Sequence, residues 1–270
     1  MILMAMVLMA ATCNVVEPEP PKPSEFSKEQ REKLGDIIHS AILTNPTEFP
    51  ILPNVAPYDK LYDFTQLLYN LASHIPHNDT QSPDANRWDL DRAWTVTILD
   101  HEEVINFIAP GGNLYISTGM LKTLRYESEL FYLFAFEVCL MDKRYLFNRL
   151  LNEYNTSLIE EAIKELPSVN TPSPKDLAST ISELNFDAEE VREIDEFAAN
   201  LICNSSQYNR KSIIEILTIR LNEVADWSTK RPSYYRRVEH VESLSVEDAG
   251  ACGNLSTLGK YQEFVLDILD

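Results

Sequence analysis

One carboxylate stands alone in the most apolar stretch of this 270-residue chain. Residues 130–141 read LFYLFAFEVCLM, and Glu137 is their only charged side chain. A carboxylate there can act as a general base, or it needs a partner, because burying an uncompensated charge is costly. A metal would need ligands four residues apart on one helix face. Phe136 and Leu140 have that spacing, but neither side chain has a lone pair to donate.

The histidines and the buried cysteine do not supply the missing ligands. The five histidines are His39, His74, His77, His101 and His240. Only His74 and His77 are close in sequence, and they flank Pro76, where an exposed loop is expected rather than a metal site. Cys139 is expected to be a small buried hydrophobe, since no histidine lies near it in sequence.

Three short strands are predicted before the apolar run. Alternating and β-branched residues indicate strands at Trp94–Leu99, Val104–Ala109 and Asn113–Ile116. Gly111 and Gly112 supply the positive φ values that the turn between the last two requires.

Helices are predicted over most of the remaining chain, with Ser27 as the cap of the first. Prolines in residues 171–174 interrupt the later ones. The expected spans are Phe26–Leu43, Tyr58–Ile75, Thr118–Leu124, the apolar helix opened by Glu127 and Glu129, Arg144–Glu165, Ala188–Cys203, Ser212–Ala225, Tyr234–Leu244 and Tyr261–Leu269. Helices around a small three-stranded sheet make the expected fold class α+β.

Residues 105–119 and the helices that follow resemble a known family. The segment INFIAPGGNLYISTG is similar to the N-A-F-x-x-P-G-G strand and turn of HtpX-type, CAAX-prenyl-protease-like zinc metallopeptidases. In that family an H-E-x-x-H helix follows at this distance. The resemblance covers about Asp91 to Leu244 and implies a mostly helical, zincin-like fold.

The resemblance also implies that the metal ligands have been replaced. The two histidine positions fall on Phe136 and Leu140, and Glu137 occupies the general-base position between them. The third ligand position falls on Val191 when Asp195 is aligned with the family aspartate. A shift of one or two residues would place Glu190 or Glu193 there instead. On the first alignment the site has no cofactor, and Glu137 is vestigial.

The segment RPSYYRRV at 231–238 resembles the family's H-P-S-x-x-x-R-[IV] element, with Arg231 in the histidine position. Because zinc is absent on this alignment, Arg231 or Lys230 is a candidate to compensate the charge of Glu137. The alternatives are a protonated Glu137 or one hydrogen-bonded to nearby backbone.

In active members of the family, the N-A-F-like strand pairs with an extended peptide through its main chain. The corresponding residues are Asn106, Phe107, Ile108 and Ala109. This mode of binding needs no metal. We therefore expect a non-catalytic, peptidase-derived protein that binds a polypeptide or an envelope protein.

Two other functions are weighed. One is an active metallopeptidase with unconventional ligands, such as Glu137 with Glu190 or Glu193; zinc would be its cofactor, although carboxylates alone favour harder cations. The other is a structural surface lipoprotein, which differs only in lacking a peptide groove.

The N-terminus indicates export. Residues 1–13 read as an apolar signal segment, and Ala10 to Cys13 resembles a bacterial lipobox whose Cys13 is lipidated. The proline-rich residues 14–25 then form a tether to a body at 26–270. This organisation predicts a lipid-anchored protein of the bacterial cell envelope. The alternative is an apolar N-terminal helix that packs on the body.

Composition narrows the classes of partner. A hydrophobic content of 44% and a charged content of 24% are typical of a globular protein. A net charge of −19 argues against binding to nucleic acid. Cys139, Cys203 and Cys252 allow one disulfide in an oxidising compartment, but their spacing does not choose the pair.

Overall fold

The computed structural model describes residues 26–74, 94–164, 170–220, 234–244, 252 and 258–270. Over these residues the chain has a mostly helical α+β fold with a small three-stranded sheet, which confirms the predicted fold class. The predicted signal segment, the lipidation site Cys13 and the tether lie outside the described residues. No helix in the described part is long and apolar enough to cross a membrane.

The sheet has the strand order β1-β3-β2. β1 (Thr95–Leu99) runs parallel to β3 (Asn113–Ser117), whereas β2 (Asn106–Ala109) runs antiparallel to it. Gly111 and Gly112 in the β2–β3 turn have φ values of 84° and 82°. The prediction that this turn needs positive φ is confirmed, and glycine adopts such values without strain.

Side chains of α2 (Asp59–His74) cap the outer edge of β1. Val96 N donates to Gln66 Oε1 at 2.9 Å, and Ile98 N donates to the Tyr62 hydroxyl at 3.2 Å. These bonds satisfy backbone donors that would otherwise be left at a strand edge. The edge of β1 is therefore closed by side chains of a helix.

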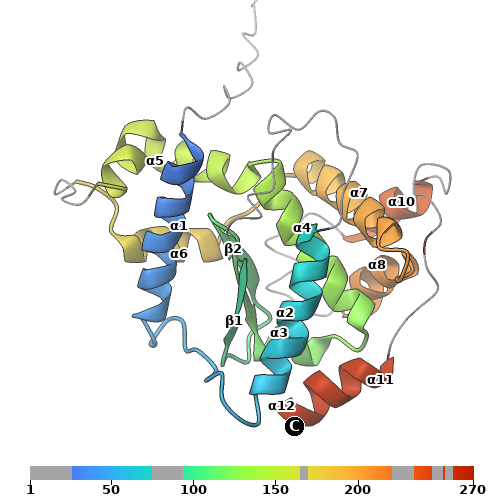
Figure 1. Ribbon diagram of the computed structural model, residues 1–270. Helices are drawn as coiled ribbons and strands as arrows, with labels where there is room; N and C mark the ends of the chain where they lie inside the picture. The colour runs from blue at the N-terminus through green and yellow to red at the C-terminus, as the bar shows by residue number, and fades with distance from the viewer. Residues whose placement is uncertain (1–25, 75–93, 165–169, 221–233, 245–251, 253–257) are drawn as a thin grey trace, which may run out of the picture.

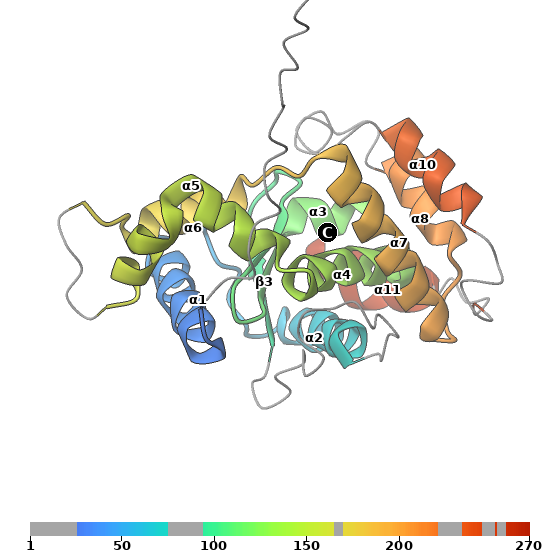
Figure 2. The same ribbon diagram turned by 90° about the horizontal axis from the view of Figure 1, so that it is seen from above.

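Helices cover both faces of the sheet, as Figure 1 and Figure 2 show from two directions. α1 (Lys28–Leu43) and α6 (Pro174–Ser182) lie on one face, with α5 (Tyr145–Ala162) beyond them. α2 and α4 (Glu127–Asp142) lie on the other. The buried residues form one continuous core around the sheet and α4.

α1 begins at the predicted cap and approaches the β2–β3 turn closely. Ser27 Oγ accepts from Gln30 N, and the Gln30 side chain accepts from Ser27 N, which completes a capping box. A Cβ atom added at Gly35 would stand 1.8 Å from the carbonyl oxygen of Pro110. Only glycine allows α1 to lie this close to the turn.

The predicted apolar helix is α4, and it lies at the centre of the molecule. Every residue of α4 except Met141 is buried, because α2, α5 and helices from the second half of the chain surround it. Its first turn is closed by the buried Glu129, whose Oε2 accepts from the backbone N–H groups of Arg125 and Tyr126 at 2.7 and 3.2 Å. A helix that is apolar on all sides is stable only in such surroundings.

Two features of α5 and α6 differ from the prediction. The expected single helix 144–165 is broken at Asn155, whose φ of 58° and ψ of 163° are not helical. α6 was not predicted, because the prolines at 172 and 174 were interpreted as an interruption. Ser173 caps α6, and Pro174 occupies its first turn, where a missing N–H costs nothing.

The remaining elements of the described part are α3 (Thr118–Thr123), α7 (Ala188–Asn204), α8 (Lys211–Glu215), η1 (Ile216–Arg220), α10 (Tyr234–Ser243), α11 (Leu258–Tyr261), η2 (Gln262–Leu266) and α12 (Asp267–Leu269). α7 and α8 pack against α4, and α10 packs against α7 and α8. The predicted span 212–225 changes from α-helix to π-helix at Ile216, and its last residues lie outside the described part.

One disulfide joins Cys203 at the end of α7 to Cys252, 49 residues further along the chain. Cys139 is buried in α4 as a free thiol. The structure thus selects one of the three pairings that the sequence left open.

Five of the buried, hydrogen-bonded tyrosine hydroxyls in the described part of the chain have a raised pKa. The group comprises Tyr62, Tyr69, Tyr115, Tyr208 and Tyr261, whose partners are Leu52 O, Gly112 O, His39 Nδ1, a Glu127 oxygen and Leu121 O. Burial raises the pKa of each of them above its ordinary value. A charged phenolate would lose hydration in these positions.

This group predicts a loss of stability at alkaline pH. Because the folded-state pKa values exceed the unfolded value of about 10, the protonated hydroxyls stabilise the fold fully below that pH and lose this contribution as the pH rises. We expect the ultraviolet absorbance of tyrosinate to rise in two steps, the second coinciding with unfolding measured by circular dichroism. In urea-unfolded protein all twelve tyrosines should titrate together. A single reversible step in the folded protein would contradict the prediction.

Candidate functional site

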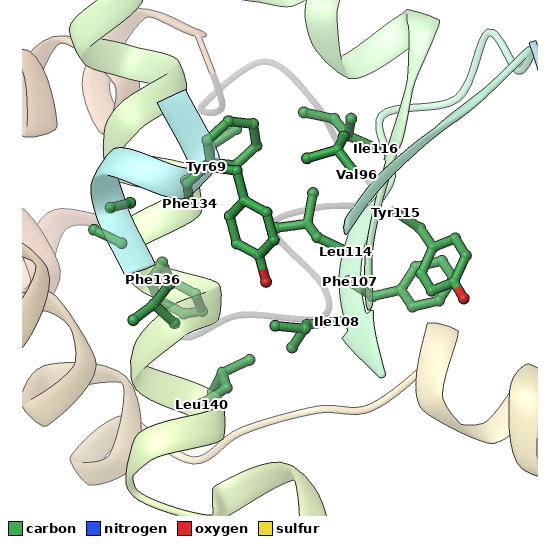
Figure 3. Close-up of a cluster of buried hydrophobic side chains, with 14 of the residues drawn as sticks. Tyr69, Val96, Phe107, Ile108, Leu114, Tyr115, Ile116, Phe134, Phe136 and Leu140 are labelled. Carbon is green, nitrogen blue, oxygen red and sulfur yellow. The ribbon is translucent and has the colours of Figure 1, made fainter. Parts of the chain in front are cut away.

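Packed apolar side chains fill the three positions that the family resemblance assigns to metal ligands. Phe136 and Leu140 are each 2% exposed, and Val191 is fully buried. Figure 3 shows Phe136 and Leu140 on α4, with Ile108 of β2 and the ring of Tyr69 beside them. None of the three replacing side chains has an atom that binds a metal. These positions therefore contribute to the hydrophobic core.

Glu137 is fully buried in the same region, and its partner is a side-chain amide. Asn106 Nδ2 donates to Glu137 Oε1 at 2.6 Å, which joins α4 to β2. Burial and the nearby charge of Glu137 together raise the pKa of Tyr69 well above its ordinary value. The predicted charge partners Arg231 and Lys230 lie outside the described residues.

A second buried polar group joins three helices. Arg237 on α10 forms a bidentate ion pair with Asp195 on α7: Nε to Oδ2 is 2.8 Å, and Nη2 to Oδ1 is 2.8 Å. The Tyr132 hydroxyl on α4 donates to Asp195 Oδ1 at 2.7 Å and accepts from Arg237 Nη2 at 2.6 Å. These side chains are 3% exposed for Arg237 and fully buried for the other two. We call them the Asp195–Arg237–Tyr132 group.

The partners of Arg237 keep it charged in the core. Burial lowers the pKa of Arg237, but the Asp195 carboxylate and Tyr132 outweigh that effect, and the pKa stays above its ordinary value. The guanidinium carbon also lies 5.5 Å from the centroid of the Phe136 ring. An aromatic face attracts a cation at this distance. Phe136, which lies at one of the positions that the resemblance assigns to a ligand, thus contacts the arginine of the buried ion pair.

The alternative ligands on α7 are engaged with α5. Arg149 contacts Glu190 and lies 3.6 Å from Asp187, while the Tyr145 hydroxyl donates to Glu193. These contacts join both carboxylates to side chains of α5. Within the described ranges there is no group of three or more histidine, cysteine, aspartate and glutamate side chains placed to hold a metal ion.

The predicted peptide-binding strand is covered. Ser117 N donates to Ile105 O and Gly112 N donates to Ala109 O, so the register turns the main-chain groups of Ile108 away from β3. These outward groups would pair with a peptide. Phe107, Ile108 and Ala109 are nevertheless buried, whereas Asn106 is half-buried. α6 packs against β2.

No protein-family model matches this chain, and no curated protein matches it. The resemblance to HtpX-type metallopeptidases therefore rests on the motif residues, and we treat it as a proposal.

Sequence reasoning did not identify the buried side-chain roles of four residues, which are Asn106, Tyr132, Asp195 and Arg237. Arg237 occupies the arginine position of the R-P-S-x-x-x-R element, and Asp195 occupies the aligned aspartate position. The sequence predicts only Arg231 and Lys230 as charge partners. The paired motif positions were a usable signal for this ion pair. Tyr132 had no such signal. Asn106 was assigned a main-chain role, whereas its side chain binds Glu137.

Proposed function

We propose that this chain is a non-catalytic domain derived from a zincin-like metallopeptidase, anchored in the bacterial cell envelope, where it binds a polypeptide or an envelope protein. The observation that carries the proposal is a contrast between two sets of motif positions. The metal-ligand positions Phe136, Leu140 and Val191 are apolar and buried. The polar positions kept from the motifs make buried bonds to one another.

The arrangement of the motifs supports descent from such a fold. The motif-bearing elements are β2, α4, α7 and α10, which are far apart in sequence and meet in one region. Glu137 bonds to the strand motif through Asn106, and the acidic helix bonds to the C-terminal motif through Asp195 and Arg237. A chance match of short motifs gives no reason for their polar residues to pair.

The disulfide between Cys203 and Cys252 supports placement outside the reducing cytosol. It agrees with the apolar segment and lipobox-like Cys13 at the N-terminus.

A second function is favoured by the covered strand. Because Ile108 is only 1% exposed, a peptide can pair with β2 only if the segments over it move. If they do not move, the domain is a structural lipoprotein without a peptide groove.

Metal analysis of the purified full chain tests the absence of catalysis. We expect sub-stoichiometric zinc and no hydrolysis of casein, with or without a chelator. Stoichiometric zinc, together with hydrolysis that both a chelator and Glu137→Gln abolish, would overturn the proposal.

Restoring the ligands tests the descent from a metallopeptidase. The triple variant Phe136→His, Leu140→His and Val191→Glu should bind zinc stoichiometrically, because two histidines and a carboxylate are a sufficient ligand set. Adding Glu137→Gln should leave zinc binding intact, since Glu137 is not a ligand in this scheme. A folded triple variant that binds no zinc would reject the assigned positions, and circular dichroism establishes that it is folded.

A pull-down of proteins from detergent-solubilised envelope, with the purified chain as bait, distinguishes polypeptide binding from a purely structural role. A partner that binds again when purified, with cross-links mapped to β2, supports polypeptide binding. Absence of any such partner favours the structural lipoprotein.

A further inference from the structure

α5 is interrupted at an exposed asparagine. Asn155 has a φ of 58° and a ψ of 163°, a conformation that side-chain-bearing residues rarely adopt inside a helix. Its Oδ1 accepts from Leu158 N at 3.1 Å, which caps the second half of α5. Residues 155–157 are all exposed. The break thus presents a short non-helical segment at the surface.

This segment carries an acceptor pattern for a sugar. Asn155, Thr156 and Ser157 form N-x-S, the sequence that N-linked glycosylation requires. The capping bond from Leu158 N uses the Oδ1 atom of Asn155 and not its Nδ2 atom. Within the described part of the chain, Nδ2 makes no hydrogen bond. Glu153, exposed two positions before the acceptor, offers a charged contact to an enzyme.

The acceptor residues are open to solvent. Because residues 155–157 are all exposed, a first sugar on Asn155 needs no rearrangement of the fold. Tyr154 and Leu158, which flank these residues in sequence, help to line a hollow of about 420 Å³ together with Asp176 and Thr180 of α6. An aromatic ring and hydroxyl groups are surfaces on which a sugar packs and forms hydrogen bonds.

A second N-x-S sequence lacks this geometry. Asn204, Ser205 and Ser206 end α7, and Asn204 itself is helical and adjacent to the disulfide at Cys203. The Ser205 hydroxyl donates to Ile202 O at 2.6 Å, which holds that turn closed. When proline is excluded at the middle position, the remaining N-x-S and N-x-T sequences begin at positions 78 and 254, outside the described residues.

We propose that Asn155 is an N-glycosylation site whose donor is a polyprenyl-diphosphate-linked oligosaccharide. Nδ2 attacks the anomeric carbon of the first sugar, a C–N bond forms, and the C–O bond to the diphosphate breaks. Polyprenyl diphosphate leaves, and the amide proton passes to the medium. The proposal rests on export to the compartment that holds such a donor, but not on polypeptide binding.

The test uses the folded, oxidised full chain, a membrane oligosaccharyltransferase and a polyprenyl-diphosphate-linked oligosaccharide. Peptide mass spectrometry should find the oligosaccharide on Asn155. Asn155→Gln and Ser157→Ala should abolish this modification. Ser157→Thr should retain it, because N-x-T is also an acceptor sequence. Ser157→Ala is the sharper variant, because it leaves the capping side chain of Asn155 in place. Asn204→Gln is the matched control and should retain full modification of Asn155.

Two results would overturn the proposal. One is an unmodified Asn155 in the folded chain, whether or not the urea-unfolded chain is modified there, since the fold would then not present the acceptor. The other is modification that survives Asn155→Gln, which would place the sugar elsewhere.

Discussion

Replacing Arg237 with methionine is expected to lower the free energy of unfolding by about 3–5 kcal/mol, the usual effect of removing one partner of a buried ion pair. The substitution leaves the carboxylate of Asp195 buried with only the Tyr132 hydroxyl as a donor among the three members of the group. It also removes the cation beside the Phe136 ring. Urea denaturation of the full chain, followed by circular dichroism, measures the loss.

The matched control is the double variant Asp195→Leu and Arg237→Met, in which both charges are removed. Because no uncompensated charge remains, the double variant should regain most of the lost stability. Arg237→Lys should be intermediate, since an ammonium group keeps the charge but cannot form both bonds to Asp195. If Arg237→Met unfolded at the same urea concentration as the wild type, the ion pair would not hold α7 and α10 together.

Replacing Asn106 with aspartate is expected to destabilise the fold at pH 7 by about 3 kcal/mol, because two carboxylates in one buried site repel each other and raise the pKa of one of them. The donor atom 2.6 Å from Glu137 Oε1 then becomes an oxygen, and two carboxylates share one buried site. The pair can remain only if one carboxyl keeps a proton, so its folded-state pKa rises.

The pH dependence has a definite sign. When folding raises the pKa of a carboxyl, the free energy of unfolding falls as the pH rises from the unfolded-state pKa of about 4 through the raised folded-state pKa. Near pH 4 and below, the carboxyl is protonated in both states and the penalty disappears. The difference between wild type and Asn106→Asp should therefore shrink as the pH falls from 7 to 4. Urea denaturation at several pH values measures it.

Exchanging the two groups supplies the control. In Asn106→Asp with Glu137→Gln, an amide and a carboxylate face each other again, now in reversed positions. This double variant should recover most of the stability and lose the added pH dependence. Equal stability of wild type and Asn106→Asp at pH 7 would show that Glu137 is protonated in the native protein.

Most helices and all three strands of the described part could be predicted from local sequence. Ser27 and Glu129 cap helices by bonds to residues three or four positions away, and Gly111 and Gly112 permit the turn by their own backbone freedom. Such signals act within a few residues, so they are visible in the chain itself. The same local logic was available for α6, where Ser173 and Pro174 mark a helix start that was interpreted as a break.

The partners of the buried charges could not be predicted in this way. Asn106 and Glu137 are 31 residues apart, and Asp195 and Arg237 are 42 apart. Which side chains meet depends on the packing of α4 against β2 and α7. Local preferences do not specify that packing. Arg231 was predicted from its motif position as a partner of Glu137 and lies outside the described residues. Arg237, six residues later in the same motif, forms a different buried pair, with Asp195.

The sequence alone determined that the chain is acidic and that its most apolar segment contains one carboxylate. It also determined that the positions which the family resemblance assigns to metal ligands hold aliphatic or aromatic residues. Only the tertiary structure decided that those positions are packed as core, that Glu137 bonds to Asn106, and that Cys203 pairs with Cys252. The physical reason is that residue type limits which interactions a side chain can make. The choice of partner is made when distant segments are brought together in the core.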